Sequence, residues 1–271
     1  MKNIEVSVLL PVWNEKLEFF KKAVESILCQ TFSNFELIII IDELEDHYTP
    51  FINRYNDPRI RIIKNGQNIG ITKSLNIGLK EASGKYIARL DSDDYCDQNR
   101  LLSQYDFMEK KTEYVLCGCK NVEIRGKNIR PSHRRFLEDD TEIRANIALL
   151  FPFSHSSFFF RKSAAIEIGG YTSDYLFAQD YDFICRMLMV GKVKNLNEVL
   201  VFQRFKKLTP IIRAKNRRQQ LNSLNIKAMA YRNHGGDRLG YYYSQLRVII
   251  ALVLPNRVKN IIRYMAGRET L

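Results

Sequence analysis

A seven-residue run at positions 35–41, FELIIII, constrains the fold of this chain most strongly. Strands with such continuous apolar character are buried on both faces, and they occur in parallel sheets that helices cover on both sides. Three further strand-like segments lie at residues 5–12, 59–64 and 85–90, and apolar residues at helical spacing follow the first and the third of the four strands. This alternation over residues 1–95 predicts a doubly wound α/β sheet.

The rest of the chain shows a less regular pattern. The sequence predicts helices over residues 101–108, 140–150 and 179–188, and strands over residues 114–124, 156–161 and 195–205. Gly169 and Gly170 are expected to form a turn, because glycine adopts backbone conformations that a helix interior excludes. Residues 127–135 are basic and are expected to form a loop. From Pro210 onward the spacing is helical again.

The stretch Lys85–Asp94 reads KYIARLDSDD, a strand that runs directly into three carboxylates, at Asp91, Asp93 and Asp94. Open α/β sheets bind ligands at the edge formed by the carboxyl ends of their strands. Alternate residues of an extended chain face the same side, so Asp91 and Asp93 are expected to point into one site while Ser92 points away. Such a pair of oxygen ligands suits Mg²⁺ or Mn²⁺. An acidic surface turn or a helix cap is the alternative, since Asp is common at both.

Two other predicted strands also end in polar residues, Asn14 and Glu15 after the first and Asp42 after the second. These strand ends are expected to share one edge of the sheet with the acidic stretch. No G-x-G-x-x-G follows the first strand, which disfavours a dinucleotide-dependent oxidoreductase, and the sequence contains no Walker phosphate loop.

The chain carries 42 Lys and Arg against 30 Asp and Glu, a formal net charge of +12, and the excess is concentrated after Arg204. Such a charge suits nucleic acid, anionic lipid or phosphorylated substrates as partners. No segment reaches the roughly 18–20 apolar residues of a membrane-spanning helix, and the first apolar run is too short for a secretory signal and is interrupted by Pro11. Five scattered cysteines fit a reducing compartment. We therefore expect a cytoplasmic protein.

Five segments resemble, in their order and spacing, family 2 glycosyltransferases of the GT-A fold, and in particular the bacterial enzymes that build O-antigen, capsule and lipopolysaccharide. The segments read VSVLLPVWNE, FELIIIIDELED, NIGITKSLNIGLKEASGKYIARLDSDD, GGY and QDYDF. The resemblance implies a Rossmann-like mixed sheet flanked by helices over residues 1–205, with a nucleotide-sugar-binding half at 1–95 and an acceptor half at 96–205. Residues 206–271 would form a basic helical C-terminal extension.

The family transfers a sugar from a nucleotide diphosphate to an acceptor hydroxyl, with inversion at the anomeric carbon. The resemblance therefore implies transfer of a hexose or an N-acetylhexosamine to a lipid-linked or oligosaccharide acceptor, with a UDP-sugar as the usual donor. Mn²⁺ or Mg²⁺ would be the cofactor, because a divalent cation stabilises the departing diphosphate.

The resemblance also implies a role for each matching residue. The donor would contact Pro11, Val12, Asn14, Glu15, Asp42, Asn68, Gly70, Lys73, Asp91 and Ser92, the metal would be held by Asp93 with Asp91, and the acceptor would contact His155, Gly170, Tyr171 and Gln179. Asp180 matches the catalytic base that takes the proton of the attacking hydroxyl, a role commonly worth about 10²–10⁴ in rate.

Several of these residues have a simpler alternative. Asp180 could be an ordinary carboxylate in the first turn of a helix, and Asp182 is a rival for the base. Lys73 could be an exposed helix lysine, and His155 could be a locally satisfied histidine. The single tryptophan, Trp13, could border the base of the nucleotide or belong to the core.

The sequence departs from the family pattern at two places. A Glu usually precedes the catalytic Asp, whereas this chain has Gln179, which keeps hydrogen bonding but loses the charge. Family members also often carry a His after the last core strand, whereas residues 203–207 of this chain read QRFKK. Either a lysine of this stretch binds phosphate directly, or fewer protein ligands hold the metal.

Apolar and basic residues are mixed near the C-terminus, where the run VIIALVL (248–254) lies between Arg247 and Arg257. Such a segment suits a helix that lies in the interface of an anionic membrane. We expect peripheral contact with the inner face of the cytoplasmic membrane, where a polyprenyl-diphosphate-linked saccharide acceptor would reside. The alternative is a C-terminal helix that packs on the domain with a solvated basic face.

Two other functions compete with sugar transfer. A nucleotidyltransferase acting on sugar phosphates could use a similar acidic pair, but it would normally show a Gly-rich basic loop after the first strand, where this chain reads PVWNEKLEFF. A non-enzymatic basic nucleic-acid-binding protein would account for the net charge, but the acidic strand ends and the lack of a recognisable nucleic-acid motif oppose it. We therefore expect no nucleic-acid partner.

Overall fold

Strand β2 (Phe35–Ile41) lies inside a block of parallel strands, and all seven of its residues are buried. The computed structural model describes residues 4–132, 135–175, 177–205 and 210–253. β2 pairs in parallel with β1 (Val6–Val12) and with β3 (Ile60–Lys64), and β1 pairs in parallel with β4 (Tyr86–Arg89). The burial on both faces that the FELIIII run predicts is therefore confirmed.

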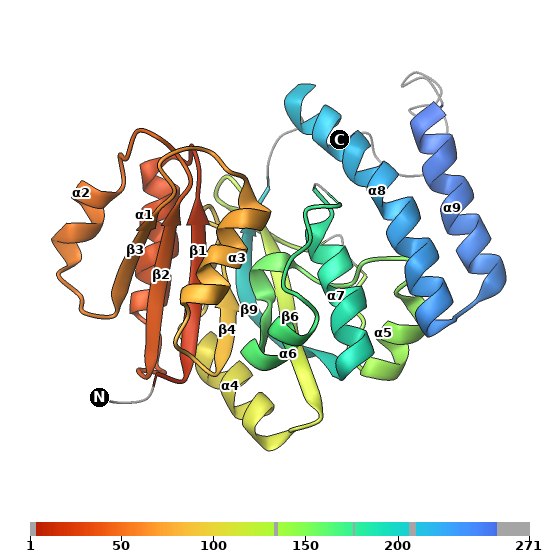
Figure 1. The fold of residues 1–271 in the computed structure, drawn as a ribbon, viewed down its shortest axis with the longest axis horizontal. Helices are drawn as coiled ribbons and strands as arrows, with labels where there is room; N and C mark the ends of the chain where they lie inside the picture. The colour runs from red at the N-terminus through yellow and green to blue at the C-terminus, as the bar shows by residue number, and fades with distance from the viewer. Residues whose placement is uncertain (1–3, 133–134, 176, 206–209, 254–271) are drawn as a thin grey trace.

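The sheet continues beyond β4 with strands of mixed direction, in the order β3-β2-β1-β4-β8-β6-β9-β5, and β7 pairs with β6. The added strands are β5 (Tyr95–Cys96), β6 (Tyr114–Arg125), β7 (Asn128–Pro131), β8 (Phe159–Arg161) and β9 (Lys192–Arg204). β8 is antiparallel to both β4 and β6, whereas β6 and β9 run parallel. The predicted mixed α/β sheet is thus confirmed (Figure 1).

Helices cover both faces of the sheet (Figure 1). They are α1 (Leu17–Leu28), α2 (Thr49–Ile52), α3 (Ile71–Glu81), α4 (Arg100–Lys110), α5 (Asp140–Asn146), α6 (Lys162–Glu167) and α7 (Gln179–Val190), with single 3-10 turns η1 (Asn53–Tyr55) and η2 (His155–Ser157). Alternate residues of β2 point to opposite faces. Ile38 and Ile40 belong to the core on the α3 side, whereas Leu37 and Ile39 belong to the core on the α1 side.

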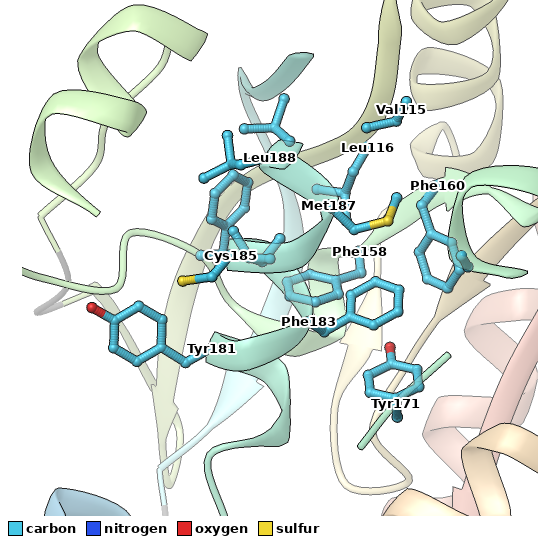
Figure 2. Packing of buried hydrophobic residues seen from close by; sticks show 14 of the residues in the cluster. Val115, Leu116, Phe158, Phe160, Tyr171, Tyr181, Phe183, Cys185, Met187 and Leu188 are labelled. Atoms are coloured by element: carbon cyan, nitrogen blue, oxygen red, sulfur yellow. The ribbon is translucent and has the colours of Figure 1, made fainter. Parts of the chain in front are cut away.

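Aromatic packing holds α7 against the sheet (Figure 2). The ring of Phe183 stacks on Tyr171 with centroids 4.2 Å apart, and it also lies 5.0 Å from Phe160 and 6.2 Å from Phe158. Phe158 directly precedes β8 and Phe160 lies in it, so these contacts connect α7 to the middle of the sheet. The first turn of α7, which contains Asp180, is therefore fixed relative to the strands.

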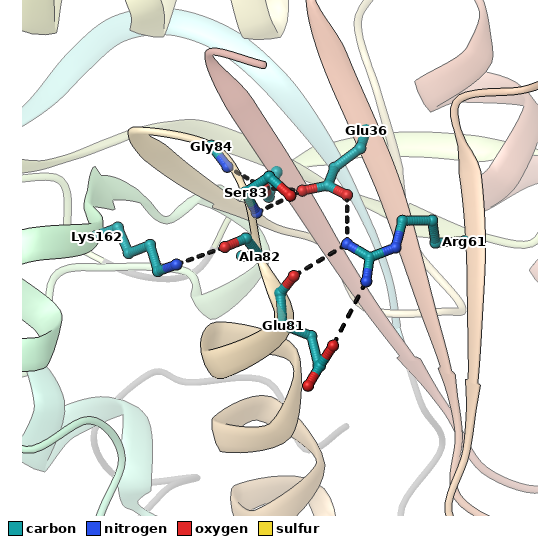
Figure 3. A network of polar contacts seen from close by, with 8 residues as sticks. Glu36, Arg61, Glu81, Ala82, Ser83, Gly84 and Lys162 are labelled. Atoms are coloured by element: carbon teal, nitrogen blue, oxygen red, sulfur yellow. Dashed lines mark hydrogen bonds and ion pairs between the residues drawn. The ribbon is translucent and has the colours of Figure 1, made fainter. Parts of the chain in front are cut away.

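A polar network around Glu36 ties together the amino-terminal ends of the parallel strands (Figure 3). The Glu36 carboxylate is 2% exposed and accepts hydrogen bonds from Ser7 Oγ at 2.6 Å, from Ser83 N at 2.6 Å and from Arg61 Nη1 at 2.8 Å. Burial would raise the pKa of Glu36, but these hydrogen bonds outweigh it and lower the pKa below its usual value. The network lies at the edge opposite to the acidic strand ends.

In the second half of the chain, the structure differs from the sequence-based prediction in one strand and in the bounds of two elements. The prediction of a loop over 127–135 is wrong, because residues 128–131 form β7, which turns back onto β6 at Gly126 (φ 63°). All four residues of β7 are exposed, so no apolar alternation marks it. The helix predicted over 140–150 ends at Asn146, and the strand predicted over 156–161 is limited to β8. Residues 133–134 lie outside the described residues.

The described part of the C-terminal extension is helical, as expected. Helices α8 (Pro210–His234) and α9 (Arg238–Val253) form an antiparallel pair next to α7 and α5 (Figure 1). Gly235 and Gly236 connect them with φ values of 69° and 117°, which favour glycine. Over residues 4–253, apart from the gaps given above, no helix combines the length and the apolar character needed to cross a membrane.

Candidate active site

The acidic stretch after β4 forms a turn instead of an extended segment. β4 ends at Arg89, and the N–H of Asp94 donates a hydrogen bond to the carbonyl oxygen of Asp91 at 3.1 Å. The turn brings one carboxylate oxygen from each of Asp91, Asp93 and Asp94 within 4.8 Å of one another. The extended geometry expected for this segment is therefore wrong, and the turn adds Asp94 to the expected pair. Ser92, between them, is 9% exposed.

Two residues that the sequence analysis did not single out hold this turn. The guanidinium of Arg89 is 1% exposed and forms an ion pair with Asp91. The hydroxyl of Ser156, in η2, lies 2.9 Å from Asp91 Oδ2 and 2.5 Å from Asp94 Oδ2. Burial lowers the pKa of Arg89, but the charge of Asp91 outweighs it, so the pKa lies above its usual value and Arg89 stays a cation.

The end of β9 closes the cluster from the other side. The backbone N–H of Arg204 donates to Asp94 Oδ1 at 2.8 Å, and its Nε donates to the carbonyl oxygen of Asp93 at 3.2 Å. The Arg204 guanidinium also lies 3.5 Å from the centre of the Phe19 ring, in α1. A second cation therefore stands beside the three carboxylates. Residues Lys206 and Lys207, considered above as phosphate ligands, lie outside the described residues.

The chemistry of the cluster fits a divalent cation. Burial raises the pKa of Asp94 well above its usual value, and the charges of Asp91 and Asp93 raise it further. A bound cation would offset this repulsion, and carboxylate oxygens are the ligands that Mg²⁺ and Mn²⁺ prefer. Asp91 and Asp94 already accept hydrogen bonds from protein groups, and Asp93 is 5% exposed. The expected metal pair, Asp91 and Asp93, thus lies in a suitable donor set.

A cavity of ≈ 410 Å³ lies beside the ends of β1 and β2. It is lined by Trp13, Asn14, Glu15, Leu17, Glu43, Glu45, His47 and Tyr48. Trp13 is 58% exposed, so the interpretation of this tryptophan as a core residue is wrong. Asn14 and Glu15 face the cavity, as a donor-binding role requires, whereas the side chains of Pro11 and Val12 are buried in β1.

Asp42 organises the segment that was expected to close over the donor. Its carboxylate accepts hydrogen bonds from Asn65 Nδ2 at 2.8 Å, from Ile69 N at 2.9 Å and from Gly70 N at 2.9 Å. Gly70 has φ 88° and begins α3, a conformation that favours glycine. Asn68 and Lys73, two further residues of the predicted donor set, are exposed. Asp42 therefore holds this loop at the edge of the sheet.

All four predicted acceptor residues, His155, Gly170, Tyr171 and Gln179, are buried. Tyr171 is 3% exposed, and its hydroxyl lies 3.1 Å from Nε2 of His155, which is 7% exposed. The interpretation of His155 as a locally satisfied histidine therefore fits the structure. Gly170 has φ 71°, and a Cβ added there would lie 2.7 Å from Oδ1 of Asn76. Gly170 and Tyr171 thus form a packed turn, with Asn76 bonded to the backbone of Tyr171.

Asp180 and Asp91 both act on Tyr171. Burial raises the pKa of the Tyr171 hydroxyl, the cation Arg89 lowers it, and the negative charges of Asp180 and Asp91 raise it again, with a net shift upward. The hydroxyl of Tyr171 is thus close enough to the first turn of α7 and to the acidic turn for charges of both to raise its pKa. The two carboxylates that were assigned to proton transfer and to the donor therefore both act on this hydroxyl.

The neighbours of Asp180 have different environments. Asp182 is 2% exposed and pairs with Arg186 at 2.6 Å, so it supports the helix and is a poor rival for the base. Gln179 is 7% exposed, and its Oε1 has no hydrogen-bond partner among the described residues. Asp180 itself is only partly buried, and its Oδ1 accepts the backbone N–H of Tyr181.

Sequence signals for the missed residues existed. Arg89 is a charged residue inside a buried strand, and Asp94 is the last carboxylate of the DSDD stretch. Ser156 follows His155 directly, and Arg204 belongs to the QRFKK stretch. Ser156 and Arg204 could not be joined to the site without knowing that η2 and the end of β9 lie beside the acidic turn.

Comparison with known proteins identifies relatives of the chain. A family model described as "Glycosyl transferase family 2" matches residues 7–169. The amylovoran biosynthesis glycosyltransferase AmsE of Erwinia amylovora is 30% identical over 199 residues, which cover 72% of this chain and 74% of AmsE. The UDP-Glc:alpha-D-GlcNAc-diphosphoundecaprenol beta-1,3-glucosyltransferase WfaP of Escherichia coli is 40% identical over 119 residues, which cover 44% of this chain and 46% of WfaP.

A solved structure has the same fold. S. aureus TarS 1-349 in complex with UDP-GlcNAc is similar with a TM-score of 0.70 and 16% sequence identity, over 90% of this chain and 71% of that chain. At this identity the similarity concerns the fold, a GT-A arrangement of a mixed sheet and flanking helices.

Proposed function

The chain belongs to glycosyl transferase family 2, and we propose that it transfers a hexose or an N-acetylhexosamine from a UDP-sugar to a hydroxyl of a lipid-linked or oligosaccharide acceptor. The reaction inverts the anomeric carbon and serves the biosynthesis of a surface polysaccharide such as O-antigen, capsule or lipopolysaccharide. The names of AmsE, for amylovoran, and of WfaP, for a diphosphoundecaprenol acceptor, support this proposal.

The observation that carries the proposal is that carboxylates of two different elements both act on the hydroxyl of Tyr171. One belongs to the acidic turn, where Asp91, Asp93 and Asp94 converge within 4.8 Å and Arg89 and Arg204 stand beside them. The other is Asp180, in the first turn of α7. A sugar nucleotide needs both kinds of group, one set for its diphosphate and one base for the incoming hydroxyl.

In the proposed reaction, the acceptor oxygen forms a bond to the anomeric carbon while the bond from that carbon to the β-phosphate oxygen breaks. Asp180 accepts the hydroxyl proton, and the electron pair of the broken bond leaves with the nucleoside diphosphate. A bound Mg²⁺ or Mn²⁺, held by Asp93 and Asp91, supplies electrostatic stabilisation of the diphosphate. Arg204 adds a positive charge at the same place.

The donor and acceptor residues follow from this arrangement. The cavity lined by Asn14 and Glu15 takes the nucleoside, and the loop that Asp42 holds, with Asn68, Gly70 and Lys73, covers it. Ser92, in the acidic turn, contacts the donor. The buried Oε1 of Gln179, which has no hydrogen-bond partner in the described part of the chain, accepts a hydrogen bond from the acceptor. It does so beside the turn of Gly170 and Tyr171, where His155 orients the tyrosine.

The acceptor also determines where the protein works. A polyprenyl-diphosphate-linked saccharide is confined to a membrane, so we propose that the protein contacts the inner face of the cytoplasmic membrane peripherally. The excess of Lys and Arg after Arg204 supports contact with anionic lipid. The product of the transfer stays on the same lipid carrier.

A thermal-shift panel tests the proposal. Purified protein is mixed with UDP- and GDP-sugars, with and without Mn²⁺, and with an NTP and an oligonucleotide as alternative ligands. A true ligand at a hundred times its Kd raises the unfolding free energy by about 2.7 kcal/mol. We expect a shift with one UDP-sugar that depends on Mn²⁺ and disappears with EDTA.

Other results would point elsewhere. A shift with NTP and a sugar phosphate, and none with sugar nucleotides, would support a nucleotidyltransferase. A salt-sensitive shift with the oligonucleotide alone would support nucleic-acid binding. Either result would contradict the proposed transfer.

A further inference from the structure

The outer side of α9 carries an unusual set of exposed apolar residues. We define the α9 stripe as Leu239, Tyr242, Tyr243, Leu246, Ile249, Ile250 and Val253. Their exposed fractions range from 42% for Ile250 to 82% for Leu239. Successive members are separated by intervals of one or three residues, so in a helix with 3.6 residues per turn they form a band roughly 120° wide.

The opposite side of α9 packs on the protein, so the stripe is not part of the fold's own core. Tyr241 stacks on Tyr231 of α8 with ring centroids 4.3 Å apart. Gln245 Nε2 donates to the carbonyl oxygen of Leu224 at 3.1 Å, and Ser244 is 8% exposed. These contacts fix the rotation of α9 about its axis and turn the stripe outward.

The charges near the stripe are almost all positive. Residues 217–253 contain Arg217, Arg218, Lys227, Arg232, Arg238 and Arg247, with Asp237 as the single acidic residue. Arg238 and Arg247 are exposed and fall at opposite borders of the stripe. The Arg247 guanidinium lies 6.0 Å from the centre of the Tyr243 ring, at the same border.

We propose that the α9 stripe is a docking surface for an anionic lipid bilayer, with α9 lying parallel to the membrane plane. Leu, Ile and Val enter the boundary between headgroups and acyl chains, the tyrosines lie at headgroup level, and the arginines reach lipid phosphates. A second copy of this chain would bring the same positive surface to the contact, and like charges oppose such pairing. An anionic bilayer supplies the complementary charge.

The docked surface is joined to the catalytic half through α8. His234 Nε2 lies 3.1 Å from the carbonyl oxygen of Cys185, and Asn233 Nδ2 lies 3.6 Å from Met189 Sδ, and both partners belong to α7. Helix α7 begins with Gln179 and Asp180. A membrane bound at the stripe is therefore held at a fixed position relative to the proposed acceptor side. This use of the surface rests on the proposed function, whereas binding itself does not.

Vesicle flotation with the full chain tests the surface. We expect binding to phosphatidylglycerol vesicles at low salt, with weak binding to phosphatidylcholine. Ile249→Glu should weaken binding about tenfold or more, since it removes apolar contact and adds a repelled charge. Ile166→Glu, at a position in α6 that is 59% exposed, is the matched control and should bind like the parent. Arg238→Gln and Arg247→Gln should each weaken binding about fivefold.

The proposal is overturned if the parent protein does not bind anionic vesicles, or if the parent and Ile249→Glu bind them equally. It is also overturned if the parent forms a concentration-dependent dimer that Ile249→Glu abolishes, while no protein binds the vesicles. The donor-induced thermal shift separates this proposal from the proposed function. Vesicle binding without any donor shift would contradict sugar transfer alone, and a donor shift without vesicle binding would contradict the docking surface alone.

Discussion

The buried guanidinium of Arg89 is paired with Asp91, two residues further along the chain, at the point where β4 gives way to the acidic turn. The pair places a permanent positive charge next to the cluster of Asp91, Asp93 and Asp94. It also fixes Asp91 before any donor arrives, so that little ordering is left for the binding step. Arg89 is thus a positioning residue for the proposed donor site.

Replacing Arg89 with Gln should weaken both the fold and donor binding. Breaking a buried ion pair leaves an uncompensated charge, so we expect a loss of roughly 3 kcal/mol in the free energy of unfolding. Urea titration measures this loss, and calorimetry measures the affinity for donor and Mn²⁺. Arg161→Gln is the control, because Arg161 bonds to backbone carbonyls of Tyr114 and Met108. It should destabilise the protein without changing donor affinity, and equal effects of both variants would contradict a positioning role.

Substitutions of Asp93 and of Asp180 should have different effects on donor binding and on turnover. Asp93→Ala should abolish metal-dependent donor binding, together with turnover. Asp180→Asn should retain donor binding, measured by thermal shift, and lower kcat by about 10²–10⁴. Asp182→Asn serves as the control, because Asp182 pairs with Arg186 and should affect stability more than kcat. Full turnover in Asp93→Ala or Asp180→Asn would reject the role assigned to that residue.

Asp42→Asn should loosen the loop over the nucleoside. The amide presents only one acceptor oxygen to three donors, so at least one N–H loses its partner, at a cost of about 1–3 kcal/mol. We expect a lower melting temperature and a higher KM for the donor, with a smaller change in kcat. Asp57→Asn removes a comparable carboxylate at the start of β3, where it bonds to Arg59, and should leave KM unchanged. An unaltered KM in Asp42→Asn would show that the loop does not contact the donor.

Lys227 predicts a dependence of stability on pH. Burial, together with the smaller effect of the charge of Arg247, lowers its pKa from 10.5 to about 8. The unfolded chain then holds this proton more tightly than the folded one, so the free energy of unfolding rises with pH between about 8 and 10.5. Lys227→Met should therefore stabilise the protein by roughly 2 kcal/mol at pH 7, and the gain should shrink as pH rises through that window.

The control for this prediction is Lys127→Met, at an exposed lysine in the turn between β6 and β7. It should change stability little at any pH. Chemical denaturation at several pH values from 7 to 10 measures both variants. If the increase in the free energy of unfolding caused by Lys227→Met stays constant across this range, the charge of Lys227 does not destabilise the fold.

The sequence was sufficient for the parts of the fold in which local pattern and tertiary position agree. The seven apolar residues of β2 define a doubly buried strand by themselves, and α1, α3 and α7 follow their apolar spacing. β7 escaped prediction because its four residues are all exposed, so only pairing with β6 makes it a strand. The local sequence of β7 does not indicate that β6 pairs with it.

The site was predicted in part for the same reason. Asp91 and Asp93 could be chosen from a strand that ends in carboxylates, but an extended segment was the wrong geometry. The hydrogen bond from Asp94 N to Asp91 O closes a turn, and this turn depends on Ser156 of η2 and Arg204 of β9, which are distant in the sequence. Arg89 lies only two residues from Asp91, but it gave no more than the weak signal of a charge in an apolar strand.

The hydrogen bond between Arg204 and Asp94 joins positions 110 residues apart, and Ser156 joins the same carboxylate from a third part of the chain. During synthesis, the acidic turn leaves the ribosome long before β9. Until β9 is made, the three carboxylates repel one another without the hydrogen bond from Arg204 to Asp94. Contacts of such wide separation form slowly. A nascent chain that ends before Arg204 would therefore lack one of the groups that hold Asp94, and the acidic turn gains its full set of partners only when β9 joins the sheet.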